Sequence, residues 1–142
     1  MIHNSTQLIK NAFDNSNIKS EIQEADNLSA VVLGFSGNNY KGIRMLFVSD
    51  GNGNDVTIRT DEFAQFPKNK MPAGIMLMNA LNQKYRYVKF LINMTTGGVC
   101  LQYDIPLRVD DNNLGPVACD ILLRTSNLLD DAYPEIMKSI WS

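Results

Sequence analysis

Histidine and cysteine are scarce in this sequence of 142 residues, which contains one His and two Cys. His3 lies in an N-terminal stretch that we expect to fray, so no Ser-His-Asp or Cys-His catalytic unit can be assembled in the core. Cys100 and Cys119 both lie among apolar residues, as reduced structural thiols do, although a disulfide between them stays open. This composition argues against histidine-dependent catalysis.

The sequence also lacks an excess of positive charge. Thirteen Lys and Arg against fifteen Asp and Glu give a net charge of -2. Neutralising phosphates requires a basic excess, so nucleic acid is not an expected partner. No run approaches the roughly 20 apolar residues that cross a bilayer, and the first residues lack the basic and apolar regions of a signal peptide. We therefore expect a cytoplasmic protein that has no membrane partner.

Several kinds of ligand motif are missing as well: the phosphate loop, paired metal ligands and the dinucleotide fingerprint. Residues 50–55 come nearest to a metal motif, because they place oxygens at the first, third and fifth positions of a calcium loop. The sixth position is Asp55 where Gly is needed, and the twelfth is Asp61 in place of Glu, so a hairpin turn is favoured. We expect no metal, no cofactor and no enzymatic activity.

What the sequence does contain is an ordinary globular share of hydrophobic residues, 44%, which suits one domain spanning residues 1–142. Its most apolar stretch begins near Pro72, and between Met71 and Leu81 only Asn79 has a polar side chain. Steps of three and four between apolar residues predict a helix there, buried on more than one side. From Tyr85 onward apolar residues alternate, which predicts a strand over residues 87–94.

The same helical spacing and strand alternation predict the remaining helices and strands. A short apolar stripe after Asn4 predicts a capped helix over residues 5–14. Alternation and β-rich composition predict further strands over residues 18–24, 30–35, 42–49, 55–60 and 99–105. After a polar loop over residues 110–115, Pro116 is expected to open a last helix and Pro134 to kink or split it. The order α-β-β-β-(β)-α-β-β-α predicts an α+β fold with a single antiparallel sheet meander under helices.

Several predicted strands carry apolar residues on both faces, whereas an antiparallel sheet needs only one covered face. The alternation places Leu33, Leu46, Val48 and Leu91 on the face opposite Val32, Met45, Phe47 and Phe90. Helices of one chain cannot easily cover both faces, so the second face predicts a homodimer. The expected partner interface comprises Leu33, Leu46, Val48, Leu91, Tyr87, Lys89 and Trp141.

Two polar groups in the predicted last helix have competing interpretations. Cys119 falls in its first turn, where the helix dipole favours a thiolate, but no basic residue is nearby and an inert buried thiol is preferred. Asp130, Asp131 and Glu135 are the densest carboxylates of the chain, and on a helix they spread around the surface. We expect them to form a solvated face.

A basic and aromatic segment precedes and enters the predicted strand at residue 87. Lys84, Arg86 and Lys89 alternate with Tyr85 and Tyr87, which superficially matches a stacking platform for single-stranded nucleic acid. In an acidic chain, a sheet surface on which basic side chains extend and Tyr rings pack is favoured. The same segment suits an acidic peptide better than nucleic acid.

The order of elements and several short motifs resemble the YbjN family of bacterial sensory transduction regulators. The motifs are Leu81-Asn82, Tyr85-Arg86-Tyr87-Val88-Lys89-Phe90, Asp104-Ile105-Pro106-Leu107 and Tyr133-Pro134. The resemblance covers nearly the whole chain, and its motifs are structural in character. It implies a fold similar to type III secretion chaperones, dimerisation, and a regulatory or protein-binding role. The family has no agreed catalytic residues, so none is assigned to this chain.

Two functions therefore compete. The first is a non-enzymatic protein-binding or regulatory module, a homodimer whose sheet face or terminal helix engages an unidentified protein partner. The alternative is a small-ligand-binding protein or an enzyme of unknown chemistry that uses Cys119 or a pocket of Tyr and Arg side chains. A deep cleft with convergent polar groups would favour the ligand, and a flat exposed sheet would favour the protein partner.

Overall fold

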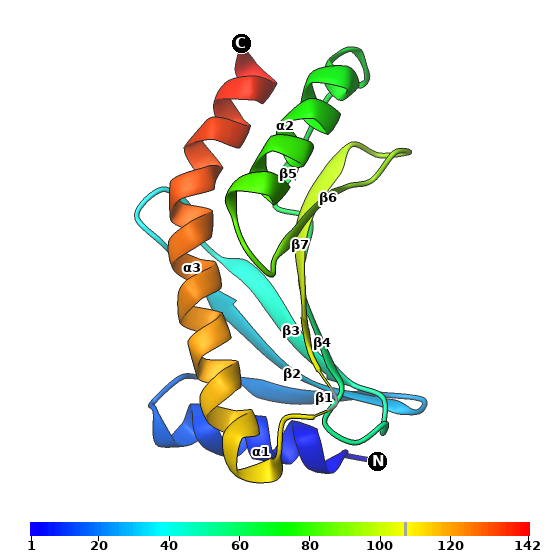
Figure 1. Ribbon diagram of the computed structural model, residues 1–142, viewed down its shortest axis with the longest axis vertical. Coiled ribbons are helices and arrows are strands. Elements are labelled where there is room, and N and C mark those ends of the chain that lie inside the picture. The colour runs from blue at the N-terminus through cyan, green and yellow to red at the C-terminus, as the bar shows by residue number, and fades with distance from the viewer. Residues whose placement is uncertain (107) are drawn as a thin grey trace.

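The computed structural model describes every residue of the chain except Leu107, the last residue of the Asp104-Ile105-Pro106-Leu107 motif. The elements follow in the order α1 (Asn4–Asn15), β1 (Glu21–Ala25), β2 (Leu28–Phe35), β3 (Ile43–Ser49), β4 (Val56–Thr60), β5 (Ala64–Gln65), η1 (Lys68–Lys70), α2 (Met71–Lys84), β6 (Lys89–Ile92), β7 (Gly98–Ile105) and α3 (Asp111–Trp141) (Figure 1). The predicted α+β order is confirmed. The structure adds the two-residue strand β5 and the short 3-10 helix η1.

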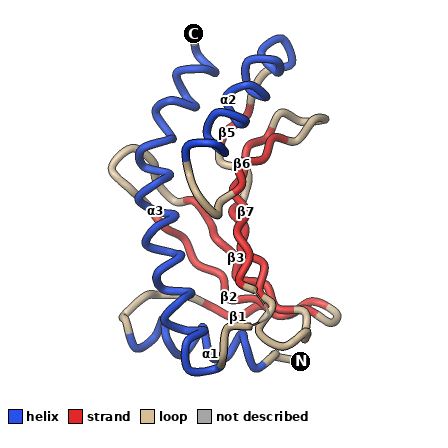
Figure 2. The backbone as a smooth tube through the Cα atoms, in the orientation of Figure 1, coloured by secondary structure: helices blue, strands red, loops and turns tan. Residues whose placement is uncertain are grey.

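The strands form one antiparallel sheet in the order β1-β2-β3-β4-β7-β5, and β6 pairs with β7 as well. Consecutive strands from β1 to β4 are neighbours, so the predicted meander is confirmed. Figure 2 shows α3 running along the length of the molecule, with α1 beside its first turns and α2 beside its last. The two chain ends consequently lie at opposite ends of the molecule (Figure 1).

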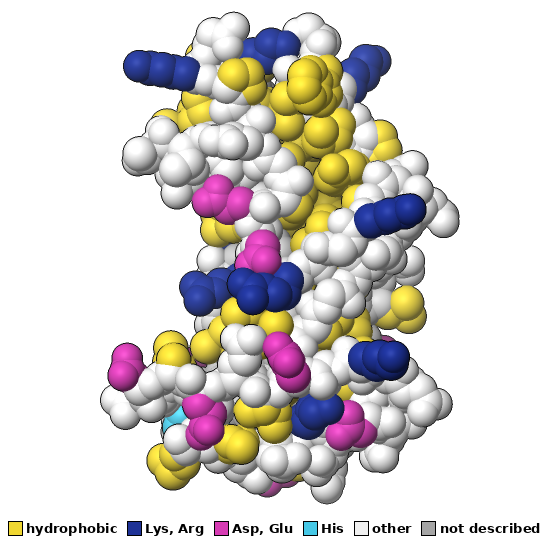
Figure 3. Space-filling model, turned by 180° about the vertical axis from the view of Figure 1, so that it is seen from behind, with side chains coloured by type: hydrophobic (Ala, Val, Ile, Leu, Met, Phe, Trp, Pro, Cys, Tyr) yellow, Lys and Arg dark blue, Asp and Glu magenta, His cyan; other side chains and the backbone are white. Residues whose placement is uncertain are grey.

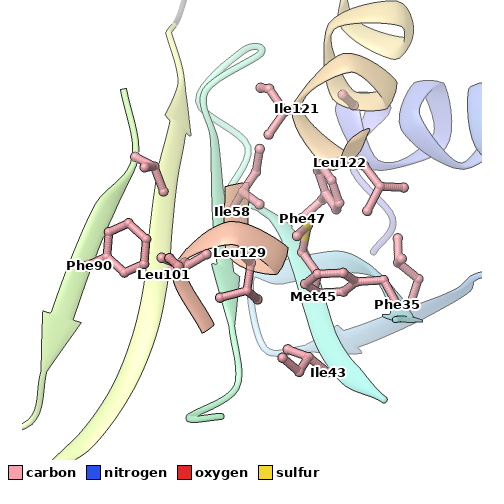
Figure 4. Close-up of a cluster of buried hydrophobic side chains, with 14 of the residues drawn as sticks. Phe35, Ile43, Met45, Phe47, Ile58, Phe90, Leu101, Ile121, Leu122 and Leu129 are labelled. Carbon is pink, nitrogen blue, oxygen red and sulfur yellow. The ribbon is translucent and has the colours of Figure 1, made fainter. Parts of the chain in front are cut away.

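The hydrophobic core lies between the helices and one face of the sheet. Directly paired residues of neighbouring strands share a face, so Phe47 and Ile58 point to the same side. The ring of Phe47 meets Phe13 of α1 edge-on, with ring centroids 5.1 Å apart. Figure 4 shows the strand side chains gathered with Leu122 and Leu129 of α3. We call this side the core face and the opposite side the second face.

Helix α3 begins at Asp111, so the polar loop predicted over residues 110–115 and the start at Pro116 are wrong. Asp110 caps the helix, because its carboxylate accepts a hydrogen bond of 2.9 Å from the backbone N–H of Asn113. Leu114 is fully buried in the second turn, where it anchors the start of the helix to the core. Because of this cap and this burial, the helix begins before Pro116, and Pro116 lies inside it.

Pro134 does not split α3, which continues without interruption to Trp141. A proline removes the N–H that would bond the carbonyl four residues earlier, here the carbonyl of Asp130. The side-chain amide of Asn39 donates to that carbonyl at 2.8 Å, and the Asp130 carboxylate accepts from the Asn39 backbone N–H at 2.8 Å. The loop between β2 and β3 therefore supplies the missing donor. Asp130 ties this loop to the helix, contrary to the expectation that it lies on a merely solvated face.

Helix α2 is buried on one side only, which corrects the prediction that it is enclosed on more than one. Gly74, Met78 and Leu81 are its buried residues. Gly74 lies so close to Phe66 that an added Cβ would come within 2.9 Å of that ring, and this close approach seats the helix on the core. Met76, by contrast, is 74% exposed. The helix lies at the end of the molecule, where only one of its sides meets the rest of the chain (Figure 1).

The N-terminal segment forms hydrogen bonds with the start of β2 and the turn before it. The backbone N–H of His3 donates to the hydroxyl of Ser29 at 3.0 Å, and its ring Nε2 lies 2.6 Å from the carbonyl oxygen of Asn27. His3 is also the N-cap residue of α1, and no side-chain hydrogen bond caps that helix, so the capping box predicted at Asn4 is absent. These contacts tie α1 to the turn between β1 and β2.

Candidate partner interface

The second face of the sheet carries an apolar region that we call the sheet patch: Leu28, Ala30, Val32, Leu46 and Val48. Val32 pairs with Leu46, and Ala30 pairs with Val48, so the side chains form a continuous group across β2 and β3. Ala30 and Val32 are buried between their neighbours, whereas Leu46 and Val48 are half-buried and Leu28 is 41% exposed. In the described part of the chain, the helices pack against the core face and leave this patch open.

Leu33 does not belong to the second face, so that part of the predicted interface is wrong. It pairs with Met45 and is 5% exposed on the core face. Val32 takes the place that alternation had given to Leu33. The cause is the run of apolar residues in β2, which are buried on both faces, so the run itself contains no signal for the register.

The predicted residues Leu91 and Lys89 do lie on the second face, but away from the sheet patch. Lys89 pairs with Gln102, and Gln102 pairs with Arg59, which together form a polar strip across β6, β7 and β4. Leu91 lies beyond this strip beside Cys100. The structure therefore divides the predicted apolar face into a larger patch on β2 and β3 and a smaller pair on β6 and β7.

Tyr87 and Trp141 are both exposed and lie apart from the sheet patch. Tyr87 is 72% exposed and sits in the turn before β6 with a positive φ of 68°, so the predicted strand starts at Lys89 and not at residue 87. Trp141 is 78% exposed at the end of α3. The ammonium of Lys70 donates to the carbonyl of Ile140 at 2.6 Å, which joins the start of α2 to the end of α3.

A second apolar surface, which the sequence interpretation missed, is the outer face of α2: Ala73, Ile75, Met76 and Ala80, all of them exposed. Seen from behind, hydrophobic side chains gather over the end of the molecule that holds α2 and the C-terminus (Figure 3). The signal was present in the sequence, because this helix is apolar most of the way round. We took this apolar perimeter to mean that the helix is buried on more than one side.

Charged residues flank the sheet patch on both sides. Glu21 of β1 pairs with Val32, and Arg59 of β4 pairs with Leu46, so opposite charges stand at the two ends of one cross-strand row. Arg44, at the border of the patch, donates from Nε to the Asp61 carboxylate at 2.9 Å, and this contact raises the pKa of Arg44. The patch is thus an apolar centre with a rim of mixed charge.

Two open hollows flank the middle of α3. One, of about 410 Å³, is lined by Tyr87, Tyr103, Arg124 and apolar residues of β7 and α3. Burial raises the pKa of Tyr103. The other, of about 400 Å³, is lined by Ile18, Phe35, Cys119, Leu122 and Leu123, among others. Both are open grooves on the surface.

The cysteines do not form a reactive pair. Both are free and half-buried. Cys119 lies in the third turn of α3, not in the first, so the argument from the helix dipole no longer applies. Burial, with Glu62 nearby, raises the pKa of the Cys100 thiol, which disfavours the thiolate that a nucleophile requires.

Three further expectations from the sequence concern the metal loop, the basic and aromatic segment, and a membrane span. Residues 50–55 connect β3 to β4, and the Asp50 carboxylate accepts from the Asn52 backbone N–H at 3.0 Å, as in a tight turn. Among the described residues, no three His, Cys, Asp or Glu side chains gather as metal ligands would. Lys84 lies over the ring of Tyr85 at 5.3 Å from its centroid. None of the helices in the described part of the chain has the length and hydrophobicity that crossing a bilayer requires.

Comparison with known proteins agrees with this geometry. A chain in the crystal structure of the ExsC–ExsE complex matches with a TM-score of 0.55 and 11% sequence identity, over 89% of this chain and 90% of that chain. At this identity the likeness shows the fold alone, and it confirms the expected similarity to type III secretion chaperones. No curated protein sequence matches the chain. The family described as "Putative bacterial sensory transduction regulator" matches residues 5–136, and the protein belongs to this family, YbjN.

Proposed function

We propose that this protein is a cytoplasmic, non-enzymatic protein-binding module that works as a homodimer. The sheet patch carries the proposal, because it is an apolar sheet face that the described helices leave open. Partly exposed Leu28, Leu46 and Val48 would leave water if a second copy covered them, and burying apolar area favours association. The family description supports a regulatory role, and the similar solved structure is of a complex between two proteins.

The charges around the sheet patch suit a symmetric dimer. Glu21, Val32, Leu46 and Arg59 form one row from β1 to β4, negative at one end, apolar in the middle and positive at the other. When two copies stack face to face about a two-fold axis parallel to the strands, this row reverses, and each Glu21 lies over the Arg59 of the other copy. A single surface then provides its own apolar and ionic complement, as a two-fold interface requires.

The competing function, small-ligand binding, has one observation in its favour, the hollow beside Tyr87, Tyr103 and Arg124. Sites for small ligands bury most of the ligand in a concave pocket, whereas this hollow is an open groove whose charged residues, Asp104, Asp120 and Arg124, are exposed. Protein binding therefore accounts for more of the exposed apolar surface than a small ligand would.

Light scattering of two matched variants tests the dimer. Leu46→Lys places a charge in the sheet patch and is expected to reduce the mass to that of the 15.9 kDa chain, with circular dichroism and melting temperature close to those of the wild type. Met76→Lys places the same charge on the outer face of α2 and is expected to leave the dimer intact. Leu91→Lys, beyond the polar strip, is expected to weaken the dimer less than Leu46→Lys.

Two results would overturn the proposal. The wild-type protein could have the monomer mass at micromolar concentration, in which case the patch has no second copy over it. Alternatively, Met76→Lys could dissociate the dimer while Leu46→Lys does not, which would put the interface on α2. An interface at the end of α3, formed by Ile136, Ile140 and Trp141, is a further alternative. Ile136 and Ile140 are 0% and 8% exposed, whereas Trp141 is 78% exposed.

A further inference from the structure

The edge of the sheet is stepped at the end of β2. β1 pairs with β2 from Leu28 as far as Val32, whereas β2 continues to Phe35 and stays paired with β3 over its last residues. Residues 33–35 therefore have a neighbouring strand on one side only. The step arises because the chain before Glu21 turns toward α1, where the N–H of Ile18 donates to the carbonyl of Phe13 at 2.8 Å.

The backbone of Gly34 faces the open side of this step. The N–H of Asp61 donates to the carbonyl of Arg44 at 3.0 Å, so the peptide groups of Arg44 are directed toward β4. In an antiparallel ladder, its partner Gly34 then belongs to a pair without mutual hydrogen bonds. The N–H and C=O of Gly34 are consequently directed away from β3, into the gap that β1 leaves.

Gly34 is also accessible. It is exposed, and a Cβ added there would meet no atom within 4 Å. An unpaired and accessible N–H and C=O on a sheet edge form a template for a further strand. A partner's side chain could bond either the N–H or the C=O of Gly34. An extended backbone can bond both groups at once, with the spacing that neighbouring strands of a sheet have.

The two sides of this edge differ in chemistry. On the core side lies the groove of about 400 Å³, lined by Ile18, Phe35, Leu122 and Leu123, and Leu123 is 63% exposed. On the second-face side lies a hollow of about 480 Å³ lined by Lys19, Glu21 and Arg44. Arg44 is already bonded to Asp61, so Lys19 is the cation in this hollow that is available to a ligand. A strand laid along β2 directs alternate side chains into these two places.

We propose that residues 33–35 of β2 are the docking site for an extended segment of a partner protein, whose side chains alternate between apolar and acidic. The segment adds a strand to the sheet through Gly34, its apolar side chains fill the groove beside Leu123, and its acidic side chain on the other face lies near Lys19. This inference rests on the proposed protein-binding function and uses the edge of the sheet, whose second-face hollow borders the sheet patch at Val32. A second copy stacked on the second face does not pair with the edge backbone of Gly34.

Selection from a library of random 12-residue peptides displayed on phage tests the inference with the full-length chain. Peptides that bind the wild-type protein are expected to alternate between apolar and acidic residues. Gly34→Pro removes the outward N–H at an edge position where proline is tolerated, and it should weaken the selected peptides at least tenfold in fluorescence anisotropy. Gly34→Ala is the matched control, since its Cβ has free space and its N–H remains, and it should bind within about twofold of the wild type.

A second measurement does not depend on the folding of a variant. Methylating the backbone nitrogens of a selected peptide one at a time should abolish binding to the wild-type protein at one position only, because among residues 33–35 only the Gly34 carbonyl faces outward and it accepts from a single peptide N–H. No enrichment of peptides, binding that survives Gly34→Pro, or binding that tolerates methylation at every position would each overturn the inference. Light scattering of Gly34→Pro separates the two proposals, since the dimer mass is expected to persist when peptide binding is lost.

Discussion

The sheet patch and the outer face of α2 are both apolar and both open, yet the sequence indicated only the first. In a strand the side-chain period of two assigns every residue to a face, so apolar Leu46 and Val48, which alternate with the core residues Met45 and Phe47, had to lie on the second face. In a helix, an apolar perimeter is equally consistent with a buried and an exposed position. The comparison teaches that a two-faced strand locates exposed apolar surface, whereas an all-round apolar helix does not.

The largest expected effect contrasts the two sides of α2. Met78→Asp places a carboxylate at a residue that is 4% exposed and is expected to destabilise the fold by about 4 kcal/mol, because an unpaired buried charge adds to the lost apolar contacts. Met76→Asp, on the outer face at 74% exposure, is expected to change stability by less than about 0.5 kcal/mol. Urea denaturation of both variants measures the difference. Equal destabilisation would mean that the outer face is covered.

The next effect concerns the part of α3 against which α2 packs. Asn39→Ala removes the amide that serves the Asp130 carbonyl beside Pro134, and the loss should cost about 1 kcal/mol. In a Pro134→Ala background the helix regains its own N–H donor, so the same substitution should cost clearly less. Thermal unfolding of the four proteins in this double-mutant cycle gives the coupling. Equal costs in both backgrounds would show that the loop does not replace the missing helical donor.

A smaller effect sharpens the symmetry proposed for the sheet patch. Glu21→Arg and Arg59→Glu should each weaken the dimer by roughly threefold, because rim ion pairs contribute little and the like charges that replace them repel. The double variant restores opposite charges across the two-fold axis and should regain most of the affinity. Sedimentation equilibrium at low salt measures the three dissociation constants, and high salt should reduce the differences. A double variant weaker than both single variants would rule out the proposed axis.

The smallest effect is expected at Lys89, on the polar strip that separates the patch from Leu91. Lys89→Ala should alter the free energy of unfolding by no more than about 0.5 kcal/mol, since the side chain is exposed. Phe90→Asp, one residue further and 1% exposed, is the contrast and should destabilise the fold as strongly as Met78→Asp. A large effect at Lys89 would show that the strip is part of an interface after all.

The sequence predicted the order of elements, and the alternation in β3 placed Met45 and Phe47 on the face opposite Leu46 and Val48. It failed where local signals compete with tertiary contacts. The apolar run of β2 contains no period, so Leu33 and Val32 were exchanged between faces. Pro134 predicted a break because its compensating donor, Asn39, lies far away in the sequence. Pro116 was interpreted as a helix start, whereas the Asp110 cap sets the beginning.

The candidate site could be predicted in part. Leu46 and Val48 do share an open apolar face, and Trp141 and Tyr87 are exposed. The stepped edge at Gly34 had no signal in the sequence, since it depends on where β1 ends relative to β2 and on the path of the chain toward α1. Strand β5, with two residues, is too short to show a period.

Nuclear Overhauser contacts between subunits test the central claim, that the sheet patch is the surface where two copies meet. A sample that mixes isotope-labelled and unlabelled chains reports only contacts that cross the interface. The account predicts such contacts from the methyl groups of Leu28, Leu46 and Val48, and none from Met76. Contacts confined to Ile75 and Met76 of α2, or no contacts between chains at all, would contradict it.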